Sequence, residues 1–159
     1  AMIMDMNLTN NVIIGRQNVK KYKSNIGTVR TKNAIKESEK VISSFDVKTP
    51  GTNTLATALS GGNQQKFVVG RELEDNPNLL IASQPTRGID IGAQALIWEK
   101  LRTARDQGLS VLLISADLEE LIGLSDRIIV FYQGRLVKEL NAENVTPEDL
   151  GGYMTGLKK

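Results

Sequence analysis

The sequence contains no cysteine and no histidine. Without cysteine the chain has no disulfide scaffold and no thiol nucleophile, which fits a reducing compartment. Without histidine it has no imidazole for acid–base catalysis and no histidine metal ligand. No apolar run approaches the ~20 residues that a membrane-spanning helix needs, and the first residues do not form a signal-peptide pattern. We therefore expect a soluble, cytoplasmic protein.

Aromatic residues are scarce, at 4% of the 159 residues, whereas 40% are hydrophobic and 24% are charged. This balance is typical of a globular chain with a real core. The net charge is only +2, so no strong overall field argues for a nucleic-acid partner.

Positive charge is concentrated in the first third of the chain. Residues 1–57 contain nine Lys/Arg and four Asp/Glu, a net charge of +5, and residues 58–159 contain eleven and fourteen, a net charge of −3. The early cations could bind anionic lipid or nucleic acid. We favour a solvated charged face, because almost no aromatic residues lie among them. These cations are Arg16, Lys20, Lys21, Lys23, Arg30, Lys32, Lys36 and Lys40.

The first half of the chain has helical patterns. Apolar residues at helical spacing predict a short helix within 7–16 and a longer one over 32–46. The polar stretch 18–31 between them predicts a loop. A third helix is predicted from Asn63 to about Leu73, directly after a serine and two glycines.

Beyond Pro77 the pattern changes to short apolar runs that alternate with helices. The order strand–helix–strand–helix–strand implies an α/β fold with a parallel sheet. The first two runs are continuously apolar, which predicts buried strands, and the second and third runs are predicted to be buried on both faces. Gln133-Gly134 predicts a hairpin turn. The predicted strands are 79–82, 111–114, 128–132 and 135–140, and the predicted helices are 92–107, 118–125 and one that begins at Thr146-Pro147.

The turn before the third helix has the composition of an anion site. Ser60 can cap the helix by accepting a backbone N–H, and Gly61 and Gly62 let a ligand approach the backbone closely. First-turn N–H groups attract negative charge, and Asn63 and Gln64 add side-chain amides. The alternative is an ordinary capped surface helix.

Four segments occur in a definite order: Leu59 to Gln65, Leu79 to Thr86, Arg87 to Asp90, and Ile114 to Asp117. This order and spacing resemble the nucleotide-binding domain of ABC transporters. The segments are similar to its signature motif, Walker B strand, D-loop and switch loop, respectively. The two motifs LSGGNQQK and QPTRGID together resemble more narrowly the second ATPase domain of the subunits that power bacterial importers of simple sugars and nucleosides.

The chain departs from the family pattern at the positions of hydrolysis. No Gly-x-x-x-x-Gly-Lys-[Ser/Thr] phosphate cradle occurs, so the chain resembles the C-terminal part of a longer polypeptide. Ser83 stands where the family has a magnesium-associated aspartate, Gln84 where it has the catalytic glutamate, and Ala116 where it has the switch histidine. None can do that work, so we predict a site that does not hydrolyse ATP. The alternative is neutral drift around a working site.

The resemblance implies a partial P-loop NTPase core with a helical subdomain over 1–75 and the later half of the core over 76–159. It implies that Ser60 to Gln64 serve ATP, with Mg²⁺, held by another nucleotide-binding domain, and that Asp90 lies at the domain interface. For Asp90 alone, a cap or loop aspartate is the alternative.

A membrane permease is a further implied partner, which would place the protein at the inner face of the membrane. Two alternatives to the importer remain. One is a non-catalytic regulatory or dimerisation module of ABC-like ancestry. The other is an ABC ATPase that acts in repair or translation. The sugar- and nucleoside-type motifs around Asn63 and Arg87 disfavour it.

In the family, the strand leading into the phosphate cradle lies between the strands matched by 111–115 and 128–132. This chain does not contain it, and its omission would expose two hydrogen-bonding edges. We expect the gap to be closed. Either the two strands collapse together and distort the core, or a swapped segment of another copy fills the slot. We favour the swap.

Overall fold

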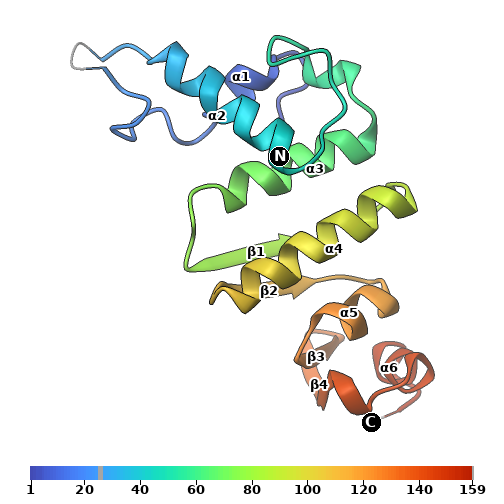
Figure 1. The fold of residues 1–159 in the computed structure, drawn as a ribbon. Helices are drawn as coiled ribbons and strands as arrows, with labels where there is room; N and C mark the ends of the chain where they lie inside the picture. The colour runs from blue at the N-terminus through green and yellow to red at the C-terminus, as the bar shows by residue number, and fades with distance from the viewer. Residues whose placement is uncertain (25–26, 159) are drawn as a thin grey trace. The chain divides into compact units, whose positions relative to one another are not determined.

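The computed structural model describes residues 1–24 and 27–158. Two positions of the predicted loop over 18–31, residues 25 and 26, therefore lie outside the described part. The chain divides into two compact units (Figure 1). Unit 1 comprises Ala1–Asn78 and Thr86–Lys100, and unit 2 comprises Leu79–Pro85 and Leu101–Lys159. The predicted domain boundary at 75/76 stays a prediction.

Unit 1 is helical. It contains α1 (Leu8–Asn11), α2 (Thr31–Ser44), the 3₁₀ turn η1 (Ala56–Ala58), α3 (Gly61–Leu73) and the first part of α4 (Ile91–Asp106). The first helix is shorter than predicted, because the chain leaves the helix after Asn11 and turns at Gly15, whose φ is +77°. The core of the unit includes Leu8, Val12, Tyr22, Ala34, Val41 and Phe67, all fully or almost fully buried.

A small residue lets α3 and α2 pack closely. A Cβ built on Gly70 of α3 would lie 2.6 Å from Cδ2 of Phe45 and 2.9 Å from Cγ1 of Val41. Real side chains do not approach so closely, so the contact requires glycine despite its low helix propensity.

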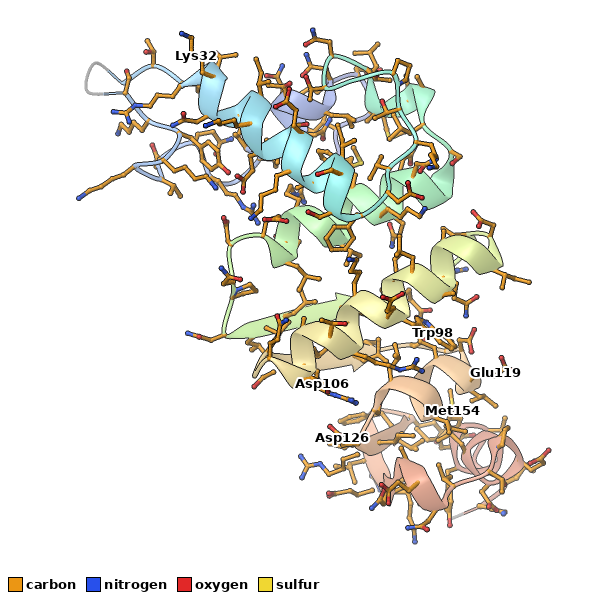
Figure 2. The ribbon with its side chains drawn as sticks, in the orientation of Figure 1. Lys32, Trp98, Asp106, Glu119, Asp126 and Met154 are labelled. Carbon is orange, nitrogen blue, oxygen red and sulfur yellow. The ribbon has the colours of Figure 1, made fainter. Side chains whose placement is uncertain are left out.

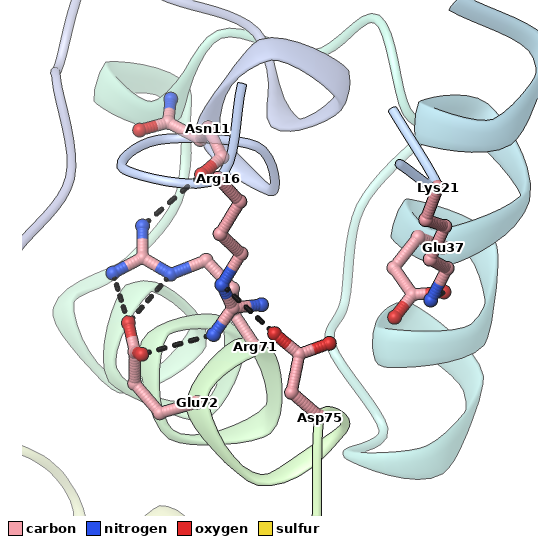
Figure 3. Close-up of polar contacts among 7 residues, drawn as sticks. All are labelled: Asn11, Arg16, Lys21, Glu37, Arg71, Glu72 and Asp75. Carbon is pink, nitrogen blue, oxygen red and sulfur yellow. Dashed lines mark hydrogen bonds and ion pairs between the residues drawn. The ribbon is translucent and has the colours of Figure 1, made fainter. Parts of the chain in front are cut away.

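An ion-pair network fastens α3 to the segment around α1 (Figure 3). The guanidinium of Arg71, 4% exposed, donates to the carbonyl oxygen of Asn11 at 3.0 Å and to Oε1 of Glu72 at 2.8 Å. Arg16 bridges Glu72 at 3.0 Å and Asp75 at 3.1 Å. Arg71 therefore satisfies a buried carbonyl group that would otherwise be costly to leave unpaired.

Unit 2 contains the strands. They are β1 (Leu79–Ser83), β2 (Ser110–Ile114), β3 (Arg127–Tyr132) and β4 (Arg135–Asn141), with α5 (Leu118–Leu124), the 3₁₀ turn η2 (Ala142–Asn144) and α6 (Pro147–Met154). β1 pairs with β2 in parallel, and β3 pairs with β4 antiparallel. Gln133 and Gly134 both have positive φ, 48° and 75°, as the predicted hairpin turn requires. A core of Leu121, Ile128, Val130, Ala142 and Leu150 joins the hairpin to α5 and α6.

The sheet is not continuous. Among the described residues β3 pairs only with β4, so the parallel part of the sheet is one pair of strands, narrower than predicted. The strands β2 and β3 line a cavity of about 700 Å³. The first expected closure, collapse of these two strands together, is wrong for this chain, because among the described residues they do not pair with each other and they line this cavity.

The predicted burial of β2 and β3 on both faces is also wrong, since Ile129 and Phe131 of β3 are 41% and 66% exposed, and β1 is likewise buried on one face only. Leu79, Ile81, Leu112 and Ile114 form one face of the two-stranded sheet and are 50–61% exposed. Their alternation follows from the two-residue period of a strand. The other face is half-buried or buried. Both strands of this sheet are therefore apolar on both faces, but other residues of this chain cover only one of these faces.

Candidate functional site

The N-terminus of α3 is an open turn built by Ser60. Its backbone is extended, with φ −64° and ψ 156°, and its Oγ accepts from the backbone N–H of Asn63 at 3.4 Å. Ser60 is thus the predicted cap. The N–H groups of Gly61 and Gly62 lie in the first turn, where the helix itself provides no acceptor. Ser60 and Gly61 are exposed and Gly62 is buried, so the turn faces solvent at Ser60 and Gly61.

The two glycines of this turn have different surroundings. A Cβ on Gly61 would have no neighbour nearer than the carbonyl oxygen of Gly88, at 4.0 Å. A Cβ on Gly62 would lie 2.8 Å from Oδ2 of Asp90 and 3.0 Å from Cβ of Ala93. Gly62 is therefore required by packing within unit 1, whereas the space beside Gly61 is free for a ligand.

The side-chain amides of Asn63 and Gln64 support the turn through hydrogen bonds within the chain. Nδ2 of Asn63 donates to Oγ of Ser60 at 2.9 Å, and its Oδ1 accepts from the backbone N–H of Lys48 at 2.8 Å. Nε2 of Gln64 donates to the carbonyl oxygens of Ala56 at 3.1 Å and Leu59 at 3.0 Å. These bonds fix the shape of the turn from behind, and ligand contact by Asn63 and Gln64 stays a prediction.

Asp90 caps α4 beside this turn. Its Oδ1 accepts from the backbone N–H of Ala93 at 2.9 Å, and this hydrogen bond holds the pKa of Asp90 below its usual value. The alternative interpretation, a cap aspartate, is therefore what the structure shows locally. Because the same carboxylate lies against Gly62, the cap also fixes the position of the α3 turn. A role at a domain interface stays a prediction.

Ser83, Gln84 and Ala116 come together in unit 2, where the paired strands β1 and β2 end. Ser83 is the register partner of Ile114, and the backbone N–H of Gln84 donates to the Ile114 carbonyl at 2.8 Å. Gln84 has a φ of +50°, an unusual backbone conformation for a residue other than glycine. Ser83 and Ala116 are exposed.

This edge does not fit a magnesium ion. The side chains at the three positions are a hydroxyl, an amide and a methyl group, whereas Mg²⁺ prefers carboxylate oxygen. The next acid, Asp117, uses its Oδ1 to cap α5 through the N–H of Glu120 at 3.0 Å. Nor do residues 1–24 and 27–158 contain a group of three or more Asp, Glu, His or Cys placed to hold a metal ion. The same described residues contain no helix long and apolar enough to cross a bilayer.

The chain is homologous to ATP-binding proteins of sugar and nucleoside importers. It is 43% identical over 156 residues to the guanosine import ATP-binding protein NupO of Bacillus subtilis, covering 98% of this chain and 30% of that protein. It is 39% identical over 153 residues to the ribose import ATP-binding protein RbsA of Clostridium tetani, covering 96% and 30%. The chain matches the C-terminal part of such proteins and spans about a third of their length. No family model matches it.

Solved structures show the same fold. A metal-chelate type ABC transporter in an inward-facing conformation matches 98% of this chain with a TM-score of 0.76 at 16% identity, over 61% of its own chain. An ATP-binding cassette in a dimeric post-hydrolysis state, bound to ADP and Pi, matches 89% with a TM-score of 0.69 at 21% identity, over 59% of its own chain. The chain is part of an ABC ATPase fold.

Two residues that support the turn at Ser60 were not predicted from the sequence. Lys48 offers its backbone N–H to Asn63, and Ala93 fixes Asp90 and packs beside Gly62. Lys48 acts through its backbone, which no side-chain pattern reveals. Ala93 could have been found, because it follows a cap aspartate by three residues, the spacing of an N-cap hydrogen bond.

Proposed function

We propose that the chain is the C-terminal part of the ATP-binding subunit of an importer for simple sugars or nucleosides. In this proposal the turn at Ser60 and Gly61 contacts the γ-phosphate of ATP, with Mg²⁺, held by a partner nucleotide-binding domain. The observation that supports it is the N-terminus of α3, which is exposed at Ser60 and Gly61 and has free space beside Gly61. A helix N-terminus with these groups favours an anion. The homology to import ATP-binding proteins supports the same role.

We further propose that the chain's own site does not hydrolyse ATP. Ser83 and Gln84 offer neither a carboxylate for a metal ion nor a base for water, and the side chain of Ala116 has no polar atom to contact phosphate. Gln84 can orient water but cannot remove its proton. The chain would thus serve a partner's ATP, and hydrolysis in the assembly would occur where the partner supplies the catalytic groups.

The proposed assembly also includes a membrane permease. Helices of unit 1 would lie against it and transmit closure of the ATP sandwich, which would keep the subunit on the cytoplasmic face of the membrane. A non-catalytic regulatory module is the rival, and adjacency of the gene to permease genes would separate the two.

The test compares two substitutions in the full-length transporter. Ser60→Arg should abolish uptake and ATP hydrolysis, because the bulky side chain fills the space meant for phosphate. Gln84→Ala should change both far less. Thr57→Arg is the matched control, since Thr57 lies on η1, is exposed and receives the same added bulk. If Gln84→Ala stops hydrolysis while Ser60→Arg does not, the two sites are assigned the wrong way round.

The chain alone provides a second test. It should bind ATP weakly and show no turnover, because it contains no phosphate cradle. Binding in the micromolar range by calorimetry, or turnover that survives repurification, would contradict the proposal.

We also propose that the isolated chain self-associates by strand exchange at the cavity between β2 and β3. Two observations favour this. The facing edges of these strands have no strand partner among the described residues, and the apolar face of β1 and β2 is exposed. Unpaired edges are a route to pairing with other chains. Light scattering after size-exclusion chromatography should show a dimer or larger species.

Leu112 lines the cavity, and Leu136 of β4 is equally exposed but lies outside it. Leu112→Lys should therefore shift the chain toward monomer, whereas Leu136→Lys should not. A chain that is monomeric at high concentration would contradict strand exchange without affecting the proposed role of Ser60.

A further inference from the structure

The loop before α2 and the start of α2 form one surface, which we name the basic tip. It comprises Val19, Lys20, Lys23, Val29, Arg30, Lys32 and Lys36. The described parts of the loop fold onto the helix start. The backbone N–H of Arg30 donates to the carbonyl oxygen of Tyr22 at 2.7 Å, and Nδ2 of Asn33 donates to that of Lys21 at 2.6 Å. Figure 2 shows Lys32 at the N-terminal end of α2, pointing away from the helix bundle.

Positive charge in this region is mostly unneutralised. Residues 16–40 contain eight Lys/Arg and two Asp/Glu. Three of the cations are used internally: Arg16 pairs with Glu72 and Asp75, Lys21 with Glu37, and Lys40 with Glu74.

The five cations of the basic tip make no ion pair with a described residue, and all are exposed. Of the two acids, Glu37 is 5% exposed and is paired, which leaves Glu39 as the exposed one. The surface therefore carries a clear excess of cations and complements a surface of negative charge.

Aliphatic side chains distinguish this surface from a solvated charged face. Val19 and Val29 are 49% and 41% exposed in the loop that carries the cations. The tip's aromatic neighbour, Tyr22, is 1% exposed and cannot stack on a base. Exposed aliphatic groups beside lysines suit the headgroup region of a bilayer, whereas nucleic-acid surfaces interleave cations with exposed aromatic rings.

We propose that the basic tip binds the anionic surface of a phospholipid bilayer. The lysines and Arg30 attract anionic headgroups, and the two valines enter the boundary between headgroups and acyl chains. This binding needs neither ATP nor a permease, so it goes beyond the proposed transport function and can be tested apart from it. Each Lys or Arg near an anionic membrane raises the binding constant by about fivefold.

The test is sedimentation of the chain with vesicles at low salt. Vesicles of phosphatidylcholine with 30% phosphatidylglycerol should bind it, and vesicles of phosphatidylcholine alone should not. Raising the salt to about 0.5 M should remove most of the binding, because the charges are exposed and screened. Lys32→Gln with Lys36→Gln, one helical turn apart on α2, should weaken binding by about 25-fold.

Arg87→Gln with Arg135→Gln is the matched control. It removes the same number of charges from exposed positions outside the tip, at cations that make no ion pair with a described residue, and should change binding by less than about threefold. Val19→Ser with Val29→Ser should remove the part of the binding that survives in salt. Circular dichroism confirms that each variant is folded.

Three outcomes would overturn the proposal. The first is an equal loss of vesicle binding in the Lys32→Gln, Lys36→Gln variant and in its control. The second is equal binding to neutral and anionic vesicles, and the third is tighter binding to a single-stranded oligonucleotide than to anionic vesicles. The last would assign the surface to nucleic acid. None of these outcomes bears on the role of Ser60 in ATP hydrolysis, which is measured in the transporter.

Discussion

Replacing each glycine of the α3 turn with alanine should have opposite structural consequences. A Cβ on Gly62 would meet Oδ2 of Asp90 at 2.8 Å and Cβ of Ala93 at 3.0 Å. The aspartate could move away only by giving up its hydrogen bond to the N–H of Ala93, and the methyl group of Ala93 belongs to the first turn of α4 and has no side-chain rotamer to change.

Overpacking of this kind costs about 1–3 kcal/mol, and loss of a cap costs about 1 kcal/mol. Better helix propensity returns up to about 1 kcal/mol. We expect Gly62→Ala to lower the stability by about 1–2 kcal/mol, which is a fall in Tm of roughly 5–15 °C for a unit of this size.

Gly61→Ala should leave the Tm unchanged or raise it, because its nearest neighbour would be 4.0 Å away. In the full transporter the same variant should lower ATP hydrolysis, since the methyl group occupies the space proposed for phosphate. Thermal unfolding followed by circular dichroism measures the first effect. Adding Asp90→Ala to Gly62→Ala should cost less than the sum of the two single changes, because one clash is relieved. Equal Tm for both alanine variants, or the reverse order, would refute the packing argument.

Three further outcomes follow from unit 1. Gly70→Ala should destabilise the chain by about 1–3 kcal/mol through its clash with Phe45, and Phe45→Leu in the same background should recover part of the loss; an unchanged urea midpoint would contradict this. Arg71→Met should cost about 2–3 kcal/mol, since it leaves the Asn11 carbonyl unpaired in a buried site, and chemical denaturation measures it. The pKa of Asp90 is lowered in the folded state by the Ala93 N–H, so its stabilising contribution is present above the unfolded value near 3.8 and is lost as the pH falls further. Asp90→Asn should therefore flatten the fall in Tm between pH 4.5 and 2.5, and an unaltered slope would exclude this contribution.

Local chemistry made much of the fold predictable. Ser60 and Thr146 cap their helices, and Gln133-Gly134 forms the turn between β3 and β4, because each depends on contacts within a few residues. The strands were found from short apolar runs, and β1 and β2 pair as the alternation of strands and helices implied.

The predictions of strand burial and strand pairing failed because they depend on contacts with segments far away in sequence. The apolar runs of β1 and β2 could not show that one face would be uncovered, because periodicity records the composition of a strand and not what covers it. Among the described residues β3 has a strand partner, β4, on one edge only, and the sequence of a strand does not show which of its edges will be paired. At the site, ligand contact by Asn63 and Gln64 stays a prediction, and their hydrogen bonds to the Lys48 N–H and the Ala56 carbonyl could not be predicted, because these groups come together only in the folded chain.

The core of Leu121, Ile128, Val130, Ala142 and Leu150 has a kinetic consequence for unit 2. All its members fall within about thirty residues at the end of the chain, so this part can form from contacts close in sequence. Register partners in the β1–β2 pair are 31 residues apart in sequence, whereas those in the β3–β4 hairpin are 3 to 14 apart, and Ile81 and Leu112 are exposed. Amide hydrogens of β1 should therefore exchange with solvent through local opening, well before those of β3, whose protection requires the hairpin and its two helices to come apart.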